Sequence, residues 1–404
     1  MTFLYNIFIL LYKIALWCFS LFNNKAKKIV ENQKNLIQKI QSSTKGEENI
    51  IWFHAASLGE FEQGKSVIKI YKQKNPNHKI LLSFYSPSGY NNMKNSELAD
   101  WVFYLPHDTR ENAKFIAKNI KPLKVIFIKY EFWFNYIREM KKENISVYFI
   151  SSIFRKEQYF FKFYGKWFAR QLQKVNYFFV QNTESEKLLK SIDINNVKVI
   201  GDSRFETVLD NAREEYTNRI IQEFCKNSKI LIAGSTWIND LNLFDDISQF
   251  ELGYLDYSII IAPHELDHLE KIKDHFYGES SSVLLSDCKI VNCSKYDVLI
   301  IDEIGILSKI YRYADIAYIG GGFGKGIHNC LEAAVYNVPV IFGPNYHKFQ
   351  EAKDFISLGI AKSVSNSDEF KNAITNFEKL DIKQISSDYF KNKIGAAEII
   401  TQHI

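Results

Sequence analysis

Short apolar runs alternate with stretches of helical spacing along most of the chain. A first series of runs lies at residues 50–55, 79–85, 125–129, 147–151, 177–181 and 197–201. A second series lies at residues 229–233, 258–262, 298–302, 316–320 and 338–342. The runs are continuously apolar, which is typical of strands covered by helices on both faces. Because strands and helical stretches alternate so often, the pattern predicts an α/β protein with doubly wound parallel sheets.

The 404 residues exceed what one hydrophobic core usually serves, which favours two domains. A long polar helical stretch at residues 205–228 separates the two series of strands. We therefore predict a first Rossmann-like domain over residues 25–215 and a second over residues 216–404. Ligands of such sheets bind beyond the carboxyl ends of the strands, so the residues after each strand are the candidates for function.

The first 24 residues differ from the rest and predict a membrane anchor. Residues 2–22 are apolar apart from Asn6, Lys13 and Ser20, and their length matches a bilayer core of about 30 Å. Lys13 would be costly at mid-membrane, so the helix either spans the bilayer or lies on its surface; a buried N-terminal helix is the third reading. The lysines that follow favour the cytoplasmic face; they are Lys25, Lys27, Lys28, Lys34 and Lys39.

Composition narrows the class of protein. Hydrophobic residues make up 46% and charged residues 24%, as in an ordinary folded chain. The net charge of +5 is too small to indicate a nucleic-acid partner. The five cysteines form no Cys-x-x-Cys pair, so neither a zinc knuckle nor a disulfide framework is indicated, and a reducing compartment fits best.

The segment from Gly320 to Glu332 carries the sharpest chemical signal. Its glycines follow a predicted strand and would let the backbone approach a ligand. Asn329 is placed to begin a helix as its N-cap, and the helix N-terminus would attract a phosphate. Glu332 would then reach a ribose hydroxyl pair, although Asn329 and Glu332 also fit a variant capping box. Because the segment matches neither a Walker loop nor Gly-x-Gly-x-x-Gly, it predicts only a nucleotide site of unspecified kind.

Several stretches, in order along nearly the whole chain, resemble the Kdo transferases of lipopolysaccharide synthesis. These enzymes move 3-deoxy-D-manno-octulosonic acid (Kdo) from CMP-Kdo to a lipid A precursor. The resemblance implies a GT-B glycosyltransferase with two Rossmann-like domains facing a cleft, preceded by a membrane-anchor helix. The stretches are residues 53–60 (FHAASLGE), 130–133 (YEFW), 201–205 (GDSRF), 233–237 (AGSTW), 262–264 (APH) and 319–351, with Pro339 and Gly343-Pro344.

By position in these motifs, three residues carry over as catalytic. Glu60 matches the general base, which would deprotonate the acceptor hydroxyl. Glu131 would stabilise the transition state or organise the acceptor pocket, and Arg204 would stabilise charge on the leaving phosphate. The plain alternatives are a dipole-favoured glutamate for Glu60, a buried paired carboxylate for Glu131 and a surface arginine for Arg204.

The resemblance also implies a set of residues that bind CMP. Pro263 and His264 would contact the base and phosphate, and Ser235 would donate to phosphate. The roles of His328, His347 and Lys348 stay open. The whole predicted CMP site is Ser235, Pro263, His264, Ile304, Gly305, Ile306, Gly322, Asn329, Cys330, Leu331 and Glu332.

The chain contains no Asp-x-Asp pair, with which many diphosphate-donor transferases hold a metal. CMP has one phosphate, so we expect no metal and no cofactor. The expected partners are CMP-Kdo, a lipid A precursor and membrane lipids, at the cytoplasmic face of the inner membrane. Three alternatives remain: a GT-B transferase that uses a UDP-sugar on a lipid, a GT-B-folded sugar epimerase, and a non-catalytic membrane-bound nucleotide-binding protein.

Overall fold

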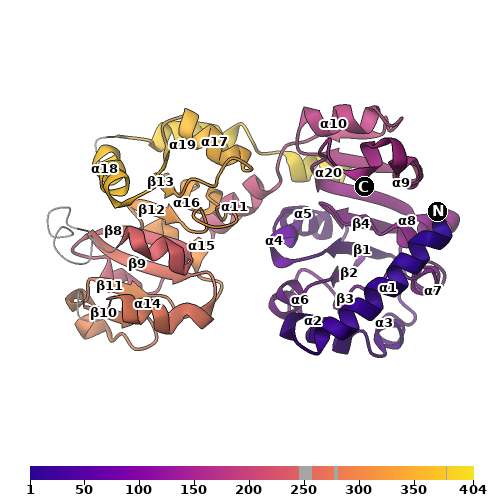
Figure 1. Ribbon diagram of the computed structural model, residues 1–404, viewed down its shortest axis with the longest axis horizontal. Helices are drawn as coiled ribbons and strands as arrows, with labels where there is room; N and C mark the ends of the chain where they lie inside the picture. The colour runs from indigo at the N-terminus through magenta and orange to yellow at the C-terminus, as the bar shows by residue number, and fades with distance from the viewer. Residues whose placement is uncertain (245–256, 277–280, 379) are drawn as a thin grey trace. The chain divides into compact units, whose positions relative to one another are not determined.

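The computed structural model describes residues 1–244, 257–276, 281–378 and 380–404. Its internal contacts divide the chain into two compact units (Figure 1). The N-terminal unit comprises Met1–Thr207 and Lys393–Ile404, and the C-terminal unit comprises Val208–Asn392. Each unit is built around a parallel sheet, as the strand pattern predicts.

The described part of the N-terminal unit has a seven-stranded parallel sheet in the order β3-β2-β1-β4-β5-β6-β7. Chain order reverses between β1 and β4, which creates a topological switch point at the carboxyl ends of these two strands. The strands are β1 (Ile50–Ala55), β2 (Lys79–Phe84), β3 (Trp101–Tyr104), β4 (Lys124–Ile128), β5 (Ser146–Ser152), β6 (Tyr177–Val180) and β7 (Val197–Val199).

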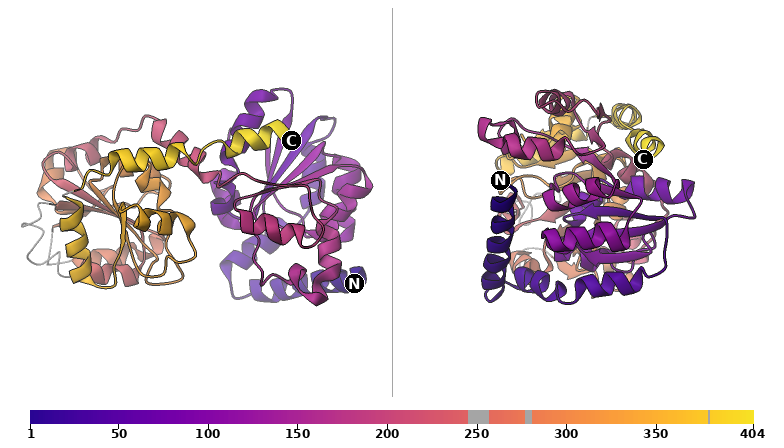
Figure 2. Two further views of the ribbon diagram at one scale, coloured as in Figure 1. Left: turned by 90° about the horizontal axis from the view of Figure 1, so that it is seen from above. Right: turned by 90° about the vertical axis from the view of Figure 1, so that its right-hand side faces the viewer.

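Helices flank both faces of this sheet (Figure 2). Residues 62–64 separate two helices, Leu58–Phe61 and Lys65–Lys74, and a Cβ atom at Gly64 would lie 2.3 Å from the Ile128 side chain. The helical segments are α1 (Thr2–Ser20), α2 (Asn24–Asn32), α3 (Leu36–Ser43), α4 (Leu58–Phe61), α5 (Lys65–Lys74), α6 (Pro87–Met93), α7 (Arg110–Phe115), η1 (Ile116–Ile120), α8 (Phe134–Lys142), η2 (Tyr159–Phe161), η3 (Phe163–Gly165), α9 (Lys166–Leu172), α10 (Thr183–Lys190), α11 (Arg204–Arg213), which runs into the second unit, and α20 (Ala396–His403).

The C-terminal unit has a second seven-stranded parallel sheet among its described residues, in the order β10-β11-β9-β8-β12-β13-β14. Its switch point lies between β8 and β12. The strands are β8 (Lys229–Thr236), β9 (Tyr257–Pro263), β10 (Ser282–Leu284), β11 (Val298–Ile300), β12 (Ile316–Ile319), β13 (Val340–Phe342) and β14 (Ala361–Ser363).

The helices of the C-terminal unit that lie in its described residues are mostly short. They are α12 (Arg219–Phe224), η4 (Ile238–Leu243), η6 (Leu266–His268), α14 (Leu269–Phe276), η7 (Ile290–Lys295), α15 (Leu307–Ile310), η8 (Tyr311–Tyr313), α16 (Leu331–Ala334), α17 (Gln350–Ser357), α18 (Ser367–Phe377) and α19 (Lys383–Lys391).

The last helix differs from the predicted domain division, in which residues 216–404 form one domain. Helix α20 packs on α5 in the N-terminal unit. Ala397 and Ile400 of α20 are fully buried in the same apolar cluster as Phe53 of β1. Burial of these side chains in the first core therefore assigns residues 393–404 to the N-terminal unit.

Helix α1 lies along the N-terminal unit and is bonded to it. The Tyr5 hydroxyl donates to Asp108 Oδ2 at 2.5 Å, and Asn135 Nδ2 donates to Asn6 Oδ1 at 2.9 Å. Farther along the helix, the hydroxyls of Tyr12 and Tyr85 are 2.7 Å apart. One side of the predicted anchor thus packs against the domain that follows it.

Candidate active site

Glu60 lies in the first turn of α4, just beyond the carboxyl end of β1. Its Oε2 atom accepts a hydrogen bond of 2.8 Å from the backbone N–H of Ala56. Burial, and after it the negative charge of Glu131, raises the pKa of Glu60 to about 7 against the opposing charge of Lys129. A carboxyl group with this pKa can accept a proton near neutral pH, which suits a general base.

Glu131 follows β4, the neighbour of β1, and is held by two nitrogen-bearing rings. Its Oε2 atom accepts a hydrogen bond of 2.7 Å from Trp133 Nε1 and lies 3.2 Å from His54 Nε2. His54 is a fully buried residue of β1, and its Nδ1 atom lies 2.9 Å from Ser83 Oγ. The switch point of the sheet therefore positions Glu131 near Glu60, because these two residues follow adjacent strands.

Lys129 is a candidate that the sequence analysis missed. It is the residue after β4 and has a left-handed backbone, with φ at 70°. Burial lowers the pKa of its amino group, and Glu60 and Asp202 oppose this shift while Arg204 adds to it. The charges of Glu60, Asp202 and Arg204 are therefore all close enough to act on Lys129. A lysine that directly ends an apolar strand was the available signal.

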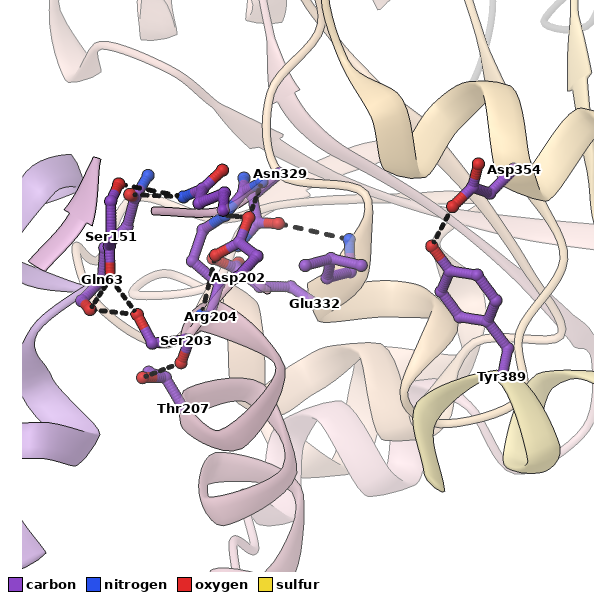
Figure 3. Close-up of polar contacts among 12 residues, drawn as sticks. Gln63, Ser151, Asp202, Ser203, Arg204, Thr207, Asn329, Glu332, Asp354 and Tyr389 are labelled. Atoms are coloured by element: carbon purple, nitrogen blue, oxygen red, sulfur yellow. Dashed lines mark hydrogen bonds and ion pairs between the residues drawn. The ribbon is translucent and has the colours of Figure 1, made fainter. Parts of the chain in front are cut away.

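Arg204 begins α11, and Asp202 fixes its orientation. The guanidinium donates to Asp202 Oδ2 at 2.6 Å from Nη2 and at 2.9 Å from Nε (Figure 3). The backbone N–H of Arg204 donates to the other carboxylate oxygen at 2.9 Å. An arginine held in this way keeps its charge in a defined place, as preorganised stabilisation of a leaving group requires.

The start of α11 is bonded to the same unit as Glu60. Ser203 Oγ lies 2.6 Å from Ser151 Oγ at the end of β5 and donates to the backbone carbonyl of Gln63. Thr207 Oγ1 donates to the Glu62 carbonyl at 2.9 Å. Figure 3 shows the Ser151, Gln63 and Ser203 side of this network. These contacts hold Arg204 in the N-terminal unit with the other two predicted catalytic residues.

In the C-terminal unit, two glycines of the predicted donor segment have a packing reason. A Cβ atom at Gly320 would lie 2.2 Å from the Ser235 carbonyl oxygen, and one at Gly322 would lie 2.5 Å from the backbone nitrogen of Gly343. These glycines let neighbouring backbones approach each other. The sequence predicted room for a ligand at these glycines but not this packing role, and the ligand site stays a prediction.

The helix that follows is shorter and begins later than predicted. Helix α16 has four residues, and Cys330 rather than Asn329 is its N-cap. Asn329 Oδ1 accepts from the backbone N–H of Leu331 at 3.2 Å, and its Nδ2 atom donates to Glu332 Oε1 at 3.0 Å (Figure 3). The side chains of Cys330 and Leu331 are fully buried. Only the backbones of these two residues are therefore available to a nucleotide.

Three rings meet beyond the carboxyl ends of β8, β9 and β12. The Trp237 ring stacks on His264, with centroids 4.7 Å apart, and its Nε1 atom donates to His328 Nε2 at 3.0 Å. The centroids of His264 and His328 are 4.3 Å apart. Burial, with a smaller contribution from His264, lowers the pKa of His328 to about 4, so His328 is neutral at pH 7. Of these three residues, only His264 was predicted from the sequence to bind the donor.

The remaining predicted donor residues follow adjacent strands. Ser235 is the last residue but one of β8 and has φ at 53°, and Pro263 ends the neighbouring strand β9. After β11, Gly305 has φ at 95° between an exposed Ile304 and a buried Ile306. All of them lie on the edge of the sheet where ligands of doubly wound folds bind. Among the described residues, no group of three or more His, Cys, Asp or Glu side chains is placed to hold a metal ion.

Comparison with known proteins shows which proteins the chain resembles. Residues 30–207 match the model of the 3-deoxy-D-manno-octulosonic-acid transferase (kdotransferase) family. A curated 3-deoxy-D-manno-octulosonic acid transferase of Aquifex aeolicus is 25% identical over 85% of this chain and 90% of its own length. The chain is a relative of the Kdo transferases. The resemblance predicted from the sequence is thereby confirmed.

Another curated relative is longer than the chain. The bifunctional glycosyltransferase/methyltransferase of Fusobacterium nucleatum is 29% identical over 97% of this chain, which spans 62% of that protein. Among solved structures, the UDP-GlcNAc 2-epimerase of Neisseria meningitidis is similar in fold, with a TM-score of 0.58 and 16% identity. The match covers 87% of the present chain and 98% of the epimerase chain. That likeness concerns the fold and confirms the predicted GT-B class.

Proposed function

We propose that the chain transfers Kdo from CMP-Kdo to a lipid A precursor in lipopolysaccharide synthesis, with inversion at the anomeric carbon. The single observation that carries the proposal is the state of Glu60. It lies in the region that matches the Kdo transferase family, and burial beside Glu131 raises its pKa to about 7. The pKa of a surface carboxylate that is stabilised only by a helix dipole would not be raised in this way.

The proposed reaction begins when Glu60 removes the proton of an acceptor hydroxyl. The freed oxygen attacks the anomeric carbon of Kdo as the bond to the CMP phosphate breaks through an oxocarbenium-like state. Arg204 stabilises the charge that develops on the departing phosphate. Glu131 keeps a negative charge close to the base and to the positive sugar ring. The resulting product is the Kdo glycoside of the acceptor, together with CMP.

On the donor side, the proposal assigns CMP to the carboxyl edge of the second sheet. His264 and the neighbouring rings of Trp237 and His328 form the flat group there that a nucleobase or ribose would contact. Glu332, already held by Asn329, is the proposed ribose ligand. The loop at Gly305 would contact the cytosine through its backbone. The proposal needs no metal, since the leaving group, CMP, carries only one phosphate.

Mass spectrometry of the lipid product tests the proposal directly. The full chain is incubated with CMP-Kdo and a tetraacylated lipid A precursor, and Glu60→Gln serves as the matched inactive variant. We expect a mass increase of one or more Kdo units with wild-type protein and none with the variant. Thermal stabilisation by CMP but not by UDP would support the donor assignment. Stabilisation by UDP alone would favour the UDP-sugar or epimerase alternatives.

We also propose that the chain works on the cytoplasmic face of the inner membrane, with α1 lying in the interface. Helix α1 is the one described helix whose length and composition suit a membrane. Its outer side exposes many large apolar residues, while Tyr5 and Tyr12 bond the opposite side to the domain. The exposed residues are Phe3, Leu4, Ile7, Phe8, Leu10, Leu11, Ile14, Trp17 and Phe19.

Charge near this helix is consistent with a lipid surface. Exposed lysines follow α1 on α2 and α3, and anionic headgroups attract such segments by about 1 kcal/mol per basic residue. Two further exposed rings, Phe163 and Tyr164, lie just before α9. The Trp167 ring of α9 is 5.6 Å from the Tyr5 ring of α1. Amphipathic rings of this kind favour the headgroup region of a bilayer. Together they would bring the N-terminal unit to a membrane-embedded acceptor.

A further inference from the structure

Behind Glu131 runs a continuous line of polar contacts that ends deep in the N-terminal sheet. Trp52 Nε1 donates to Ser83 Oγ at 2.7 Å, and Ser83 Oγ lies 2.9 Å from His54 Nδ1. On the other side of the imidazole, Nε2 lies 3.2 Å from Glu131 Oε2. Trp52, His54 and Ser83 are all at most 2% exposed. Buried polar atoms at these distances must be matched donor to acceptor.

The tautomer of His54 follows from this matching. If Nε2 carried a lone pair, it would face the carboxylate oxygen of Glu131 at 3.2 Å, and the two would repel. The indole nitrogen of Trp133 also lies 3.3 Å from this nitrogen, but it donates to Glu131 Oε2 at the shorter distance of 2.7 Å. A lone pair on Nδ1 would face the uncharged carbonyl oxygen of Ser83 at 3.0 Å, whereas a lone pair on Nε2 would face a carboxylate. The second repulsion is the stronger, which places the proton on Nε2. In the neutral ring, Nδ1 then needs a donor, and the hydroxyl of Ser83 supplies it. The indole N–H of Trp52 already donates to that hydroxyl oxygen, which leaves the hydroxyl hydrogen free to point at His54.

We infer that Ser83 and His54 form a directed hydrogen-bond relay that positions Glu131 for the reaction. Every donor in the series points toward the carboxylate: Trp52 to Ser83, Ser83 to His54, and His54 to Glu131. Trp133 adds a second donor to the same oxygen at 2.7 Å. His54 is thus a positioning residue and not a catalytic one, since its ring is fully buried. The role rests on the proposed function, because it assumes that Glu131 acts beside the base.

Ser83 also offers a competing arrangement that makes the inference testable. Its backbone carbonyl oxygen lies 3.0 Å from His54 Nδ1. When the hydroxyl is removed by Ser83→Ala, Nδ1 can take the proton and donate it to this carbonyl. The imidazole would then present a lone pair to Glu131. The substitution would therefore invert the tautomer while leaving the ring in place, and a wrong tautomer behind a catalytic group is costly.

Nitrogen-15 NMR of histidine-labelled full-length protein reads this tautomer without any turnover. We expect His54, assigned by its loss in His54→Phe, to show a protonated Nε2 and an unprotonated Nδ1, and Ser83→Ala to exchange them. A protonated Nδ1 in the wild-type protein, alone or together with Nε2, would overturn the relay. This result does not depend on whether the protein transfers Kdo, so the relay and the proposed function can fail separately.

Steady-state kinetics provides a second test of the relay. We expect Ser83→Ala and His54→Phe to lower kcat by about 10- to 100-fold, less than loss of the base, with CMP affinity unchanged. His54→Gln keeps an N–H directed at Glu131 and should recover part of the loss. Phe127→Leu is the packing control, because Phe127 contacts the same imidazole, at 5.8 Å between centroids, without a polar atom. An equal loss of kcat in Phe127→Leu would reduce His54 to a packing role and overturn the inference.

Discussion

The carboxylate of Asp240 accepts a hydrogen bond of 3.0 Å from the backbone N–H of Gly321. The same oxygen accepts from the backbone N–H of Trp237 at 2.7 Å, and the other oxygen accepts from the Tyr318 hydroxyl at 2.8 Å. Asp240 is fully buried. One side chain therefore joins the end of β8, the end of β12 and the glycine segment, and it sets the position of the Trp237 ring against His264 and His328.

Substitution of Asp240 is expected to weaken donor binding from a distance. Asp240→Leu leaves the N–H groups of Gly321 and Trp237 buried without an acceptor, at a cost of about 1–3 kcal/mol for each group. Part of this cost is relieved if the glycine segment shifts, and the CMP site shifts with it. We expect a lower free energy of unfolding and weaker CMP binding, measured by denaturant titration and isothermal calorimetry.

Asp240→Asn is the matched control. Its carbonyl oxygen can still accept from both N–H groups, and its NH₂ group can donate to the hydroxyl oxygen of Tyr318. Stability and CMP binding should therefore stay close to wild type. If Asp240→Leu and Asp240→Asn bind CMP equally well, Asp240 does not organise the donor site.

The raised pKa of Glu60 predicts the acid side of the pH profile. The base must be ionised to accept a proton, and its pKa in the folded protein is about 7. We expect kcat/KM to fall about tenfold per pH unit below this value and to level off above it. The measurement is kcat/KM for CMP-Kdo in buffers between about pH 5 and 9. If kcat/KM stays constant down to pH 5, Glu60 is not the base that titrates.

The same shift predicts that Glu60 opposes folding at neutral pH. Its folded pKa lies above the ordinary value, so the folded state binds more protons than the unfolded state between pH 4.5 and about 7. Stability contributed by the protonated group is then present at low pH and lost as pH rises through the folded pKa. Glu60→Gln should therefore abolish transfer and raise the unfolding midpoint at pH 8. At pH 4 the gain in midpoint should disappear, because wild-type Glu60 is then neutral.

Most of the fold could be predicted from the sequence, and the strands that were missed share one physical feature. The central strands are continuous apolar runs, and β1 is buried at every position. The missed strands β3, β10 and β14 all lie at sheet edges, and β10 is only half-buried throughout. Edge strands bury less apolar side chain, so their runs are short and resemble loops. The return of α20 to the first core depends on contacts with residues hundreds of positions away, which local patterns do not encode.

The residues of the candidate site also fall into two groups: those that sequence patterns reveal and those whose role depends on the folded structure. Glu60, Glu131 and Arg204 each follow a recognisable strand or motif, so sequence and resemblance together could name them. Lys129 was missed although a lysine directly ends an apolar run there, and Asp240 could not be found, because its importance depends on partners that folding brings together. The packing role of Gly320 and Gly322 was not predicted for a related reason. A glycine that admits a neighbouring backbone and one that admits a ligand look the same in a sequence.

Arg204 is expected to act mainly on the chemical step. Arg204→Ala should lower kcat by about 10²- to 10³-fold, as expected when one group that stabilises developing charge is removed. Arg204→Lys should recover only part of the rate, because an ammonium group lacks the fork that now reaches Asp202. Asp202→Asn keeps the arginine charge and is the control with a smaller effect. If Arg204→Ala changes only KM, Arg204 contributes to donor binding and not to stabilisation of the transition state.

The contact between Tyr5 and Asp108 distinguishes a helix docked on the domain from one that leaves it to cross the bilayer. Asp108 is buried, and burial raises its pKa to about 7, while the Tyr5 hydroxyl and the N–H groups of Asn135 and Tyr136 oppose that rise. If α1 stays docked, Tyr5→Phe removes a donor from a buried carboxyl group. The free energy of unfolding should then fall by about 1–3 kcal/mol in detergent and in vesicles alike. Phe8→Tyr, on the exposed side of the same helix, is the control and should leave the midpoint unchanged. An α1 that spans the membrane would separate Tyr5 from Asp108, so Tyr5→Phe would have no effect in vesicles even if it destabilised the detergent-solubilised protein.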